Sequence, residues 1–297
     1  MIDTYKSGFV TIVGSPSVGK STLLNALIGE KISITSIKPQ TTRNSINGII
    51  TTDEYQIIFV DTPGVNKTHN KLGKLMDKSI NDSLNGTDVV LAVIDVLRDD
   101  ANEMFLGKLS KAKSPVILLL NKVDKIKDKS KLLSIIENYK KVYNFDEIIP
   151  ISARTGEGIE EVKEAVIKRL PYGPQYYPED IITDSPERVI LSEIIREKAL
   201  ELLDEEVPHG IAVEIEKMKK RVGKEVTDVS AIIYCEKDSH KAIIIGRGGS
   251  MLKNIGSRAR ADIEEFLGMK VFLEIWVKVR KDWRDNEAEL RRLKFLE

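Results

Sequence analysis

The segment GSPSVGKS, from Gly14 to Ser21, has the residue types and spacing of a phosphate-binding loop. Its glycines let backbone amides wrap around phosphate groups, and Lys20 can reach the β and γ phosphates of a nucleotide. The Ser21 hydroxyl is suited to hold Mg²⁺, and a helix beginning here directs the positive end of its dipole at the phosphates. The expected phosphate-binding residues are Gly14, Ser15, Pro16, Ser17, Val18, Gly19, Lys20, Ser21 and Thr22.

A second motif, Asp61-Thr62-Pro63-Gly64, follows the apolar run 57–60. A carboxylate at the end of a strand lies at the ligand-binding edge of a parallel sheet, where Asp61 can hold the shell of Mg²⁺. The amide of Gly64 can approach a γ-phosphate because glycine has no side chain in the way. Taken alone, Asp-x-Pro-Gly is also a common turn. Together with the first motif, it predicts that Asp61, Thr62, Pro63 and Gly64 face a nucleotide.

A third motif, Asn121-Lys122-Val123-Asp124, ends another apolar run. The Asp124 carboxylate can accept two parallel hydrogen bonds from the N1 and N2 donors of guanine, a pattern that adenine does not offer. Ser152-Ala153, after the next apolar run, can bring a backbone amide to the guanine oxygen. These residues predict GTP and GDP, rather than ATP, as ligands.

The motifs are joined by short apolar runs that alternate with longer amphipathic segments. The expected strands are 9–13, 57–60, 89–94, 116–120 and 148–151, and expected helices include 22–27, 104–109 and 132–143. Strands alternating with helices imply a parallel sheet covered on both faces. We therefore predict an α/β P-loop NTPase fold, with a mostly parallel doubly wound sheet, in residues 1–170.

A proline-rich segment separates this domain from a second one. Residues 171–178 contain three prolines and a glycine and are expected to start a stiff linker, 171–185. The following domain, 186–281, has an expected helix at 186–203, capped by Ser185, and strands at 211–215, 229–235 and 271–279. These elements predict an α+β domain, followed by a C-terminal helical tail at 282–297.

The second domain contains a basic, glycine-rich segment. Residues 240–261 carry five Lys and Arg residues and no acid, and Gly246-Arg247-Gly248-Gly249 precedes an amphipathic helix at 250–267. Backbone amides exposed at a helix start, edged by cations, suit the phosphates of a nucleic acid. A glycine-rich turn beside a solvated basic helix face is the alternative. The expected RNA-binding residues are Gly246, Arg247, Gly248, Gly249, Lys253 and Arg258.

Composition narrows the class of protein. The chain has 297 residues, of which 41% are hydrophobic, and a formal net charge of zero, which excludes intrinsic disorder. The zero total conceals an uneven distribution, because residues 171–216 carry 3 bases and 12 acids whereas residues 217–297 carry 19 bases and 13 acids. Cys235 is the only cysteine, and the N-terminus does not resemble an export signal, so we expect a cytoplasmic protein.

The three nucleotide motifs and Ser152-Ala153 resemble, in order, the G1, G3, G4 and G5 motifs of the translation-factor-related GTPases. The resemblance implies a G2 element at residues 40–44 (QTTRN), in which Thr42, or alternatively Thr41, closes on Mg²⁺. It implies Ser21, Thr42 and Asp61 as metal ligands, and Lys20, Thr42 and Gly64 as catalytic residues. Val65 replaces the glutamine that orients water in many GTPases, so slow intrinsic hydrolysis is expected. Ser17 replaces the asparagine of potassium-activated relatives, which argues against K⁺ activation.

The second domain resembles the type II KH domains, which bind single-stranded RNA. The likeness lies in the order helix, strand, strand, G-x-x-G loop between two helices, strand. It implies that the segment before the loop is a short helix, with Ser239 as a candidate cap, although 242–245 has the composition of a strand. It also implies that Arg247 and Gly248 face the RNA backbone, and that bases lie in an apolar groove between the next helix and a sheet edge.

A P-loop GTPase joined to a KH domain resembles the Era family of bacterial ribosome-assembly GTPases over nearly the whole chain. Residues 31–36 (KISITS), 40–43 (QTTR), 207–211 (VPHGI) and 273–278 (LEIWVK) extend the likeness beyond the general motifs. The resemblance implies binding to the 3′ end of small-subunit ribosomal RNA and assistance in maturing the small ribosomal subunit. It also implies peripheral contact with the inner face of the cell membrane, and we expect a monomer.

The leading hypothesis is a GTP-driven switch that changes how the KH domain is presented to RNA. One alternative is a membrane-associated or protein-binding signalling GTPase whose KH-like domain docks a protein, and another is an RNA chaperone for which hydrolysis is incidental. Two features have open interpretations. The basic run 217–224 is an extension of the RNA surface or a solvated loop, and Trp276 and Trp283 are core residues more readily than base-stacking ones.

Overall fold

The computed structural model describes residues 4–35, 38, 41–65, 70–98, 103–128, 130–223 and 225–295. Gln40 of the expected G2 element and Lys224 of the basic run lie outside these residues. The chain forms two compact units, and most of the second is the part of the chain from Ser185 onward. No described helix is both long enough and apolar enough to cross a bilayer.

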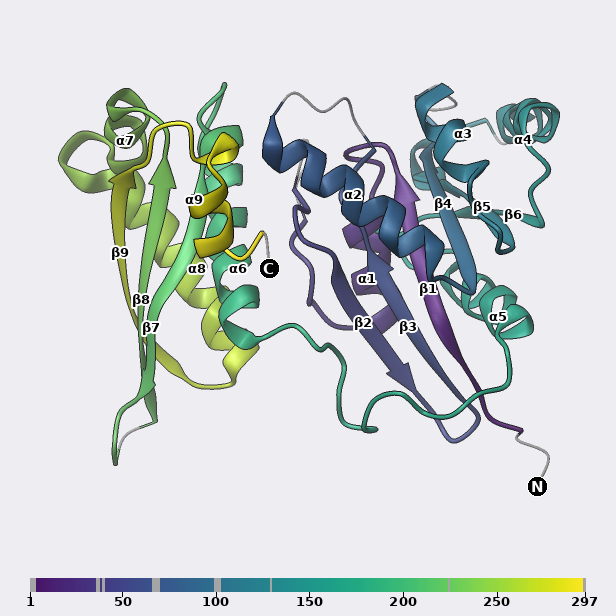
Figure 1. The fold of residues 1–297 in the computed structure, drawn as a ribbon, viewed down its shortest axis with the longest axis horizontal. Coiled ribbons are helices and arrows are strands. Elements are labelled where there is room, and N and C mark those ends of the chain that lie inside the picture. The colour runs from purple at the N-terminus through teal and green to yellow at the C-terminus, as the bar shows by residue number, and fades with distance from the viewer. Residues whose placement is uncertain are drawn as a thin grey trace. The chain divides into compact units, whose positions relative to one another are not determined.

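The first unit is a sheet with helices on both faces (Figure 1). Its elements are β1 (Lys6–Gly14), α1 (Lys20–Ile28), β2 (Ile46–Thr51), β3 (Tyr55–Asp61), α2 (Lys71–Asn85), β4 (Val89–Asp95), α3 (Glu103–Leu109), β5 (Val116–Asn121), the 3₁₀ turn η1 (Val123–Lys125), α4 (Ser130–Val142), β6 (Glu147–Ile151) and α5 (Ile159–Arg169). The strand order is β2-β3-β1-β4-β5-β6, and every pairing is parallel except β2 with β3. The mostly parallel doubly wound sheet is thus confirmed.

The central strands are buried on both faces, as their uninterrupted apolar sequences require. In β4, Val89, Leu91 and Val93 belong to one hydrophobic cluster, which includes residues of α1 and α5. The alternate residues of β4 belong to a second cluster, which includes residues of α2, α3 and α4. The sheet is therefore clamped between two cores, and the loops at its edge are held by rigid strands.

Edge strand β2 had no predicted counterpart and helix α2 no predicted bounds, for a physical reason. Strand β2 contains Asn47 and Gly48 between its isoleucines, so it lacks a continuous apolar run. Helix α2 is amphipathic but has a low mean hydropathy, because Lys, Asp, Asn and Ser fill its exposed face. Both elements are specified by packing against the sheet rather than by local composition.

The segment 171–184, expected as a linker, is bound to the edge of the first unit. Buried Gln56 donates from Nε2 to the Tyr177 carbonyl at 2.8 Å and accepts the amides of Tyr176 and Tyr177 at 2.7 and 3.0 Å. The Tyr176 ring lies 5.3 Å from the ring of Phe9. The two compact units divide after Asp184, whereas the predicted first domain ends at Leu170.

The second unit is a three-stranded sheet with helices α6, α7 and α8 on one face (Figure 1). Its elements are α6 (Glu187–Leu202), η2 (Pro208–Gly210), β7 (Ala212–Lys220), β8 (Val226–Cys235), α7 (Asp238–Ile245), η3 (Arg247–Gly249), α8 (Ser250–Leu267), β9 (Lys270–Val279), η4 (Trp283–Asp285) and α9 (Glu287–Arg292). Strand β8 is central, antiparallel to β7 and parallel to β9. The α+β fold of a type II KH domain is confirmed.

Several local predictions for this unit were wrong. Neither Ser185 nor Ser239 caps a helix, because the N-cap positions of α6 and α7 are Pro186 and Lys237 and neither has a side-chain cap. Residues 217–220 of the basic run lie in β7, so this part is not the solvated loop that one interpretation expected. Trp276, expected in the core, lies on the sheet surface with 60% of its side chain exposed, whereas Trp283 is fully buried as expected.

The C-terminal tail is fastened to the KH sheet. The indole of Trp283 donates to the Gly210 carbonyl at 3.0 Å, and its ring stacks on Phe295. From α9, Arg292 donates to Glu214 and to the Tyr234 hydroxyl, both at 2.9 Å, and its guanidinium lies over the Tyr234 ring. The tail therefore covers the end of the sheet where Tyr234 lies.

Candidate nucleotide and RNA sites

The predicted phosphate-binding loop connects β1 to α1 and is shaped by positive backbone φ angles. Gly19 has φ 103°, a conformation that a side chain rarely permits, and a Cβ there would overlap Nδ2 of Asn121. Ser17 also has a positive φ, 64°. The loop ends on the first turn of α1, where Lys20, Ser21 and Thr22 begin the helix. The amides of a helix start are thus directed at the place where phosphates would bind.

The Lys20 side chain is buried against this loop. Its ammonium donates to the carbonyls of Gly14 and Ser15, each at 3.1 Å. The charge lies close enough to Asp61 to lower the pKa of that carboxyl against the larger effect of burial. Lys20 is therefore held in place as a fixed positive charge next to the loop.

The three predicted metal ligands converge at the other side of Lys20. Ser21 Oγ donates to Asp61 Oδ2 at 2.7 Å, and Thr42 Oγ1 lies 2.9 Å from Ser21 Oγ and 3.3 Å from Asp61 Oδ2. Ser33, fully buried, also donates to Asp61 Oδ2, at 3.1 Å. Nothing in the sequence singled out Ser33, because an isolated serine between isoleucines carries no motif.

Asp61 is completely buried, and its second oxygen, Oδ1, has no hydrogen-bond partner. Burial raises the pKa of this carboxyl, partly offset by Lys20 and by hydrogen bonds from Ser21, Ser33 and Thr42. A buried carboxylate oxygen without a partner costs free energy unless a cation or donor joins it. One carboxylate and two hydroxyls are a donor set that fits Mg²⁺, which needs few protein ligands.

The segment after Asp61 packs against the phosphate loop. Thr62 Oγ1 donates to the Ile12 carbonyl at 2.7 Å, and the Val65 amide donates to the Gly14 carbonyl at 3.0 Å. At Gly64 a Cβ would lie 2.8 Å from Pro16 Cα, so only glycine permits this approach. The Val65 side chain belongs to the core cluster below α2, so it does not project toward the phosphates.

Asn121 joins the phosphate loop to the predicted guanine-binding residues. It is buried, donates from Nδ2 to the Val18 carbonyl at 2.7 Å, and accepts the Ala153 amide at 3.0 Å. The amide of Ala153, expected to face the guanine oxygen, is used by Asn121 here. Asn121 thereby fixes the spacing between the loops at the ends of β1, β5 and β6.

Lys122 lies between the phosphate loop and a residue that the motifs did not include. Its ammonium donates to the Ser17 carbonyl at 2.9 Å and to Asp95 Oδ2 at 2.7 Å. Asp95 ends β4 and pairs in register with Asn121, the last residue of β5. The signal that could have found Asp95 is its position, an acid directly after an uninterrupted apolar strand.

Asp124 presents its carboxylate at the rim of the site, where two side chains bind it. Ser152 Oγ donates to Oδ1 at 2.7 Å, and Arg154 Nη2 donates to Oδ2 at 2.5 Å. The hydrogen bond from Arg154 has the largest effect and that from Ser152 the next largest, and both lower the pKa of Asp124. The carboxylate is therefore ionised and able to accept two donors, and Arg154 is an additional residue of the site that the motifs did not indicate.

In the second unit, the predicted RNA-binding loop is the turn between α7 and α8. Gly246, Gly248 and Gly249 all have positive φ angles, 74°, 59° and 79°, which let the chain reverse within four residues. Arg247 and Gly248 are exposed at the tip. The loop therefore presents backbone and a cation to solvent at the start of α8.

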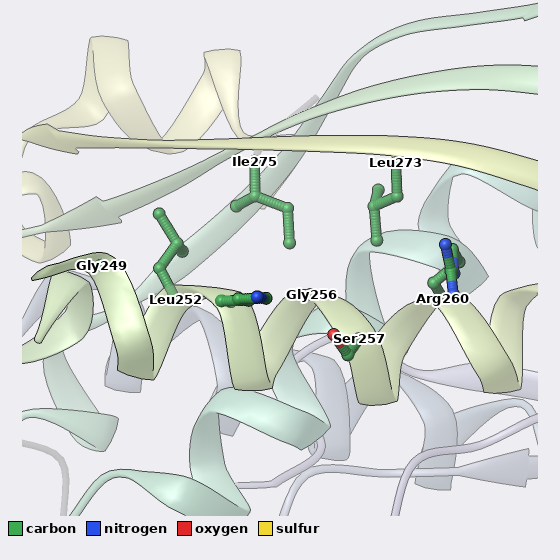
Figure 2. A pocket seen from close by; sticks show the side chains of 8 residues that line it. Gly249, Leu252, Gly256, Ser257, Arg260, Leu273 and Ile275 are labelled. Atoms are coloured by element: carbon green, nitrogen blue, oxygen red, sulfur yellow. The ribbon is translucent and has the colours of Figure 1, made fainter.

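A groove runs beside this loop, between α8 and the edge strand β9 (Figure 2). Leu273 and Ile275 point from β9 toward α8, from which Leu252 rises to meet them. Gly256 lies opposite Ile275, and a Cβ there would make ordinary contact with Ile275 Cδ1 at 3.6 Å, so only a longer side chain would fill the groove. The lining residues are Gly249, Leu252, Lys253, Gly256, Ser257, Arg260, Leu273 and Ile275.

Not every predicted RNA-binding residue reaches the groove. Gly249 and Lys253 line it, but Arg258 does not and instead donates to Asn254 at 3.2 Å. Arg260 lies at the groove, seven residues after Lys253 and thus on the same face of the helix. Helical periodicity, applied from Lys253, could have selected Arg260 over Arg258.

Comparisons with known proteins match the chain to a GTPase domain and to a KH domain. Residues 9–122 match a family model described as 50S ribosome-binding GTPase, and residues 206–284 match a KH domain model. A protein of Caldanaerobacter subterraneus subsp. tengcongensis named GTPase Era is 51% identical over 97% of both chains. A GTPase Era of Clostridium botulinum (strain Okra / Type B1) is 53% identical over 97% of this chain and 98% of its own.

Two solved structures are similar over nearly the whole chain. A crystal structure of a variant Era of Aquifex aeolicus, bound to GDP and AlF4⁻, has a TM-score of 0.94 and 41% identity, and covers 98% of this chain and 100% of its own. A crystal structure of Era in complex with MgGDPNP and nucleotides 1506–1542 of 16S ribosomal RNA has a TM-score of 0.95 and 40% identity, and covers 99% of this chain and 100% of its own.

Proposed function

We propose that the chain couples GTP hydrolysis in the first unit to RNA binding in the second. The premise is that the chain belongs to the Era family of GTPases. The chain binds GTP and GDP and hydrolyses GTP. The proposed RNA is the 3′ segment of small-subunit ribosomal RNA, and the proposed role is assembly of the small ribosomal subunit in the cytoplasm. Support comes from the relative whose structure contains 16S ribosomal RNA.

For hydrolysis, the chain supplies position and charge rather than a side-chain base. The amides of the phosphate loop and the Lys20 ammonium stabilise the negative charge that builds up on the phosphates. Because Val65 is buried, we propose that the attacking water is held by backbone groups near Thr42 and Gly64. Such an arrangement gives slow hydrolysis that an RNA or protein partner can accelerate.

We propose that Ser21, Thr42 and Asp61 hold Mg²⁺ when nucleotide is bound. This proposal is supported by the convergence of their oxygens within 3.3 Å of one another and by the unpartnered Oδ1 of Asp61. A magnesium ion there supplies positive charge to the β and γ phosphates. Thr42 joins the set from residues 41–45, so the conformation of this segment is expected to depend on the γ-phosphate.

We propose that single-stranded RNA follows the groove between α8 and β9, with its backbone at Arg247 and Gly248. The apolar walls provided by Leu252, Leu273 and Ile275 suit base faces, and Lys253 and Arg260 suit phosphates. The observation that carries the function is the presence, on one chain, of this groove and of a complete guanine-nucleotide site.

The proposed function is tested by RNA binding in different nucleotide states. Wild-type protein is titrated with an RNA comprising nucleotides 1506–1542 of 16S ribosomal RNA, in GDP and in a non-hydrolysable GTP analogue. Binding is expected to weaken as salt rises, because phosphate contacts release counterions. Arg247→Asp combined with Gly248→Asp should abolish RNA binding and leave GTP affinity unchanged, with Lys140→Asp on the exposed face of α4 as the charge control. Normal RNA binding by the double variant would contradict the assignment of the groove.

A further inference from the structure

The KH sheet has a second face that the groove does not use. Along β9, Leu273 and Ile275 point toward α8 (Figure 2). Phe272 and Trp276 stand at alternate positions of the strand and therefore lie on its opposite side. Phe272 is 49% exposed and Trp276 is 60% exposed. Large aromatic side chains exposed on one surface commonly mark a contact with a partner.

Strand pairing shows which residues surround these two aromatics. Phe272 pairs with Asp228, and Asp228 with Lys219, so all three share a face. Glu274 pairs with Ser230, which in turn pairs with Lys217. Lys278, two positions beyond Trp276, lies on the same side of β9. We call the surface formed by Lys217, Lys219, Phe272, Trp276 and Lys278 the outer face.

Two of the four acidic groups near the outer face are bound by arginines. Asp228 is bound by Arg221 at 2.6 Å, and the guanidinium of Arg221 lies over the Phe272 ring. Glu214 is bound by Arg292 at 2.9 Å. Glu274 and, in the bulge of β7, Glu216 are left to oppose the three lysines. The surface is therefore weakly basic, with aromatic rings between its cations.

The C-terminal tail covers one end of this side of the sheet and not the other. Tyr234 is buried beneath Arg292, so α9 closes the end beyond Trp276. Phe272 and Trp276 stay exposed although tail residues from Trp283 to Phe295 are packed on the same unit. The tail thus covers the Tyr234 end of this side and leaves the rings of Phe272 and Trp276 exposed.

We propose that the outer face is a second binding surface for single-stranded RNA, on which bases stack against Trp276 and Phe272. This inference rests on the proposed function, because it extends the same RNA beyond the groove. Stacking on aromatic rings flanked by cations is how proteins hold single strands without reading their sequence.

Two observations favour RNA over a protein partner. β9 is the edge strand, and it forms the wall of the groove with one set of side chains and the outer face with the alternate set. RNA leaving the groove therefore needs to pass around only a single strand. A KH groove clamps about four nucleotides, whereas the RNA bound to the related structure spans nucleotides 1506–1542 and needs further surfaces.

The first test uses the fluorescence of tryptophan. The chain has two tryptophans, and because Trp283 is fully buried, quenching by neutral acrylamide reports mainly on Trp276. Adding the 1506–1542 RNA should lower the fluorescence and protect Trp276 from acrylamide. A fragment of about four nucleotides that fills only the groove should do neither. Trp276→Phe should remove the response and keep RNA affinity, since phenylalanine retains an aromatic plane.

The second test measures affinity. Phe272→Ala with Trp276→Ala should weaken binding of the 1506–1542 RNA about tenfold or more and leave the short fragment unaffected. Lys217→Ala with Lys219→Ala should reduce the salt slope by about 1.4, roughly 0.7 for each lost phosphate contact. Leu133→Ala, an equally exposed apolar residue on α4, is the matched control. Circular dichroism and thermal melting establish that each variant is folded.

The outcomes separate this proposal from the proposed function. If the aromatic double variant binds both RNAs like wild type and RNA does not protect Trp276, the outer face is not an RNA surface, although the groove assignment stands. If wild-type protein binds neither RNA, the proposed function itself fails. If Trp276 is protected by small ribosomal subunits but not by the 1506–1542 RNA alone, the outer face binds another part of the subunit and the proposal is overturned.

Discussion

The nucleotide site and the RNA groove differ in how their functional side chains are held. Asp61, Asn121 and Lys20 are buried and hydrogen-bonded before any ligand arrives. In the groove, Lys253 and Arg260 are exposed. A small ligand of fixed shape binds tightly to a rigid site whose side chains are already in position. A long flexible strand is held by a shallow surface whose side chains can adjust to it.

The difference has an energetic origin. In the first unit, hydrogen bonds inside a low-dielectric site are strong, and a buried polar atom without a partner, such as Oδ1 of Asp61, is costly. In the second unit, exposed cations cost little to maintain and interact with phosphates in a manner that salt screens. We therefore expect single substitutions to have large effects at the first site and graded, salt-dependent effects at the second.

Lys20→Ala should give the largest effect, because it removes a buried fixed charge next to the phosphates. GTP hydrolysis is expected to fall by about a thousandfold or more, measured as phosphate release under single-turnover conditions. Lys253→Ala is the counterpart in the groove and should leave hydrolysis without RNA unchanged while weakening RNA binding. If the Lys20→Ala protein hydrolyses GTP at the normal rate, single substitutions at the nucleotide site do not have the large effects that distinguish it from the groove.

Asp124→Asn should change which base is bound rather than whether the loop binds phosphate. The amide offers one acceptor and one donor where the carboxylate offers two acceptors, so GDP affinity should fall about a hundredfold and XDP should become the preferred ligand. Competition between GDP and XDP measures the exchange. The affinity of the variant for the 1506–1542 RNA, measured without nucleotide, serves as the control. Retained preference for GDP would show that Asp124 does not read the base.

The nucleotide residues could be predicted from sequence because each stands directly after an apolar strand, where parallel topology brings loops together. Asp61, Asn121 and Ser152 follow this rule, and the structure places them on one edge. Asp95 follows it too, but it belongs to no short motif. Ser33 could not be predicted, since its bond to Asp61 depends on the path of a segment without regular secondary structure.

The second unit was less predictable because its functional residues are defined by faces rather than by motifs. Its strands and α8 were foreseen, and the seven-residue spacing from Lys253 indicates Arg260 rather than Arg258. Which face of α8 meets β9, however, is supplied only by packing. Trp276 illustrates the same limit, because alternation along a strand shows that it opposes Ile275 but not which face is covered. Helices α6, α7 and α8 cover one face of this sheet and α9 covers only the Tyr234 end of the other, so Trp276 is exposed.

Gly256 provides a sharper test of the groove than any charge does. Gly256→Leu should fill the space beside Ile275 and weaken RNA binding about tenfold to a hundredfold without altering GTP hydrolysis. Gly256→Ala is the control, since its Cβ makes ordinary contact at 3.6 Å and should stabilise the helix by about 0.5–1 kcal/mol. Titration with short RNA and thermal melting measure the two effects. Wild-type affinity in the leucine variant would show that bases do not enter the groove.

Arg154→Ala should give the smallest effect and tests whether the nucleotide site is entirely pre-formed. The exposed guanidinium binds Asp124 Oδ2, the oxygen that a guanine donor needs, so the two compete. An exposed ion pair contributes about 0–1 kcal/mol, and its removal should tighten GDP binding by at most about fivefold. The gain, measured by GDP titration, should shrink as salt rises, because salt already weakens the pair in the wild-type protein. Weaker binding by the variant would instead make Arg154 a contact of the nucleotide, and the rim of the first site would then resemble the adaptable surface of the second.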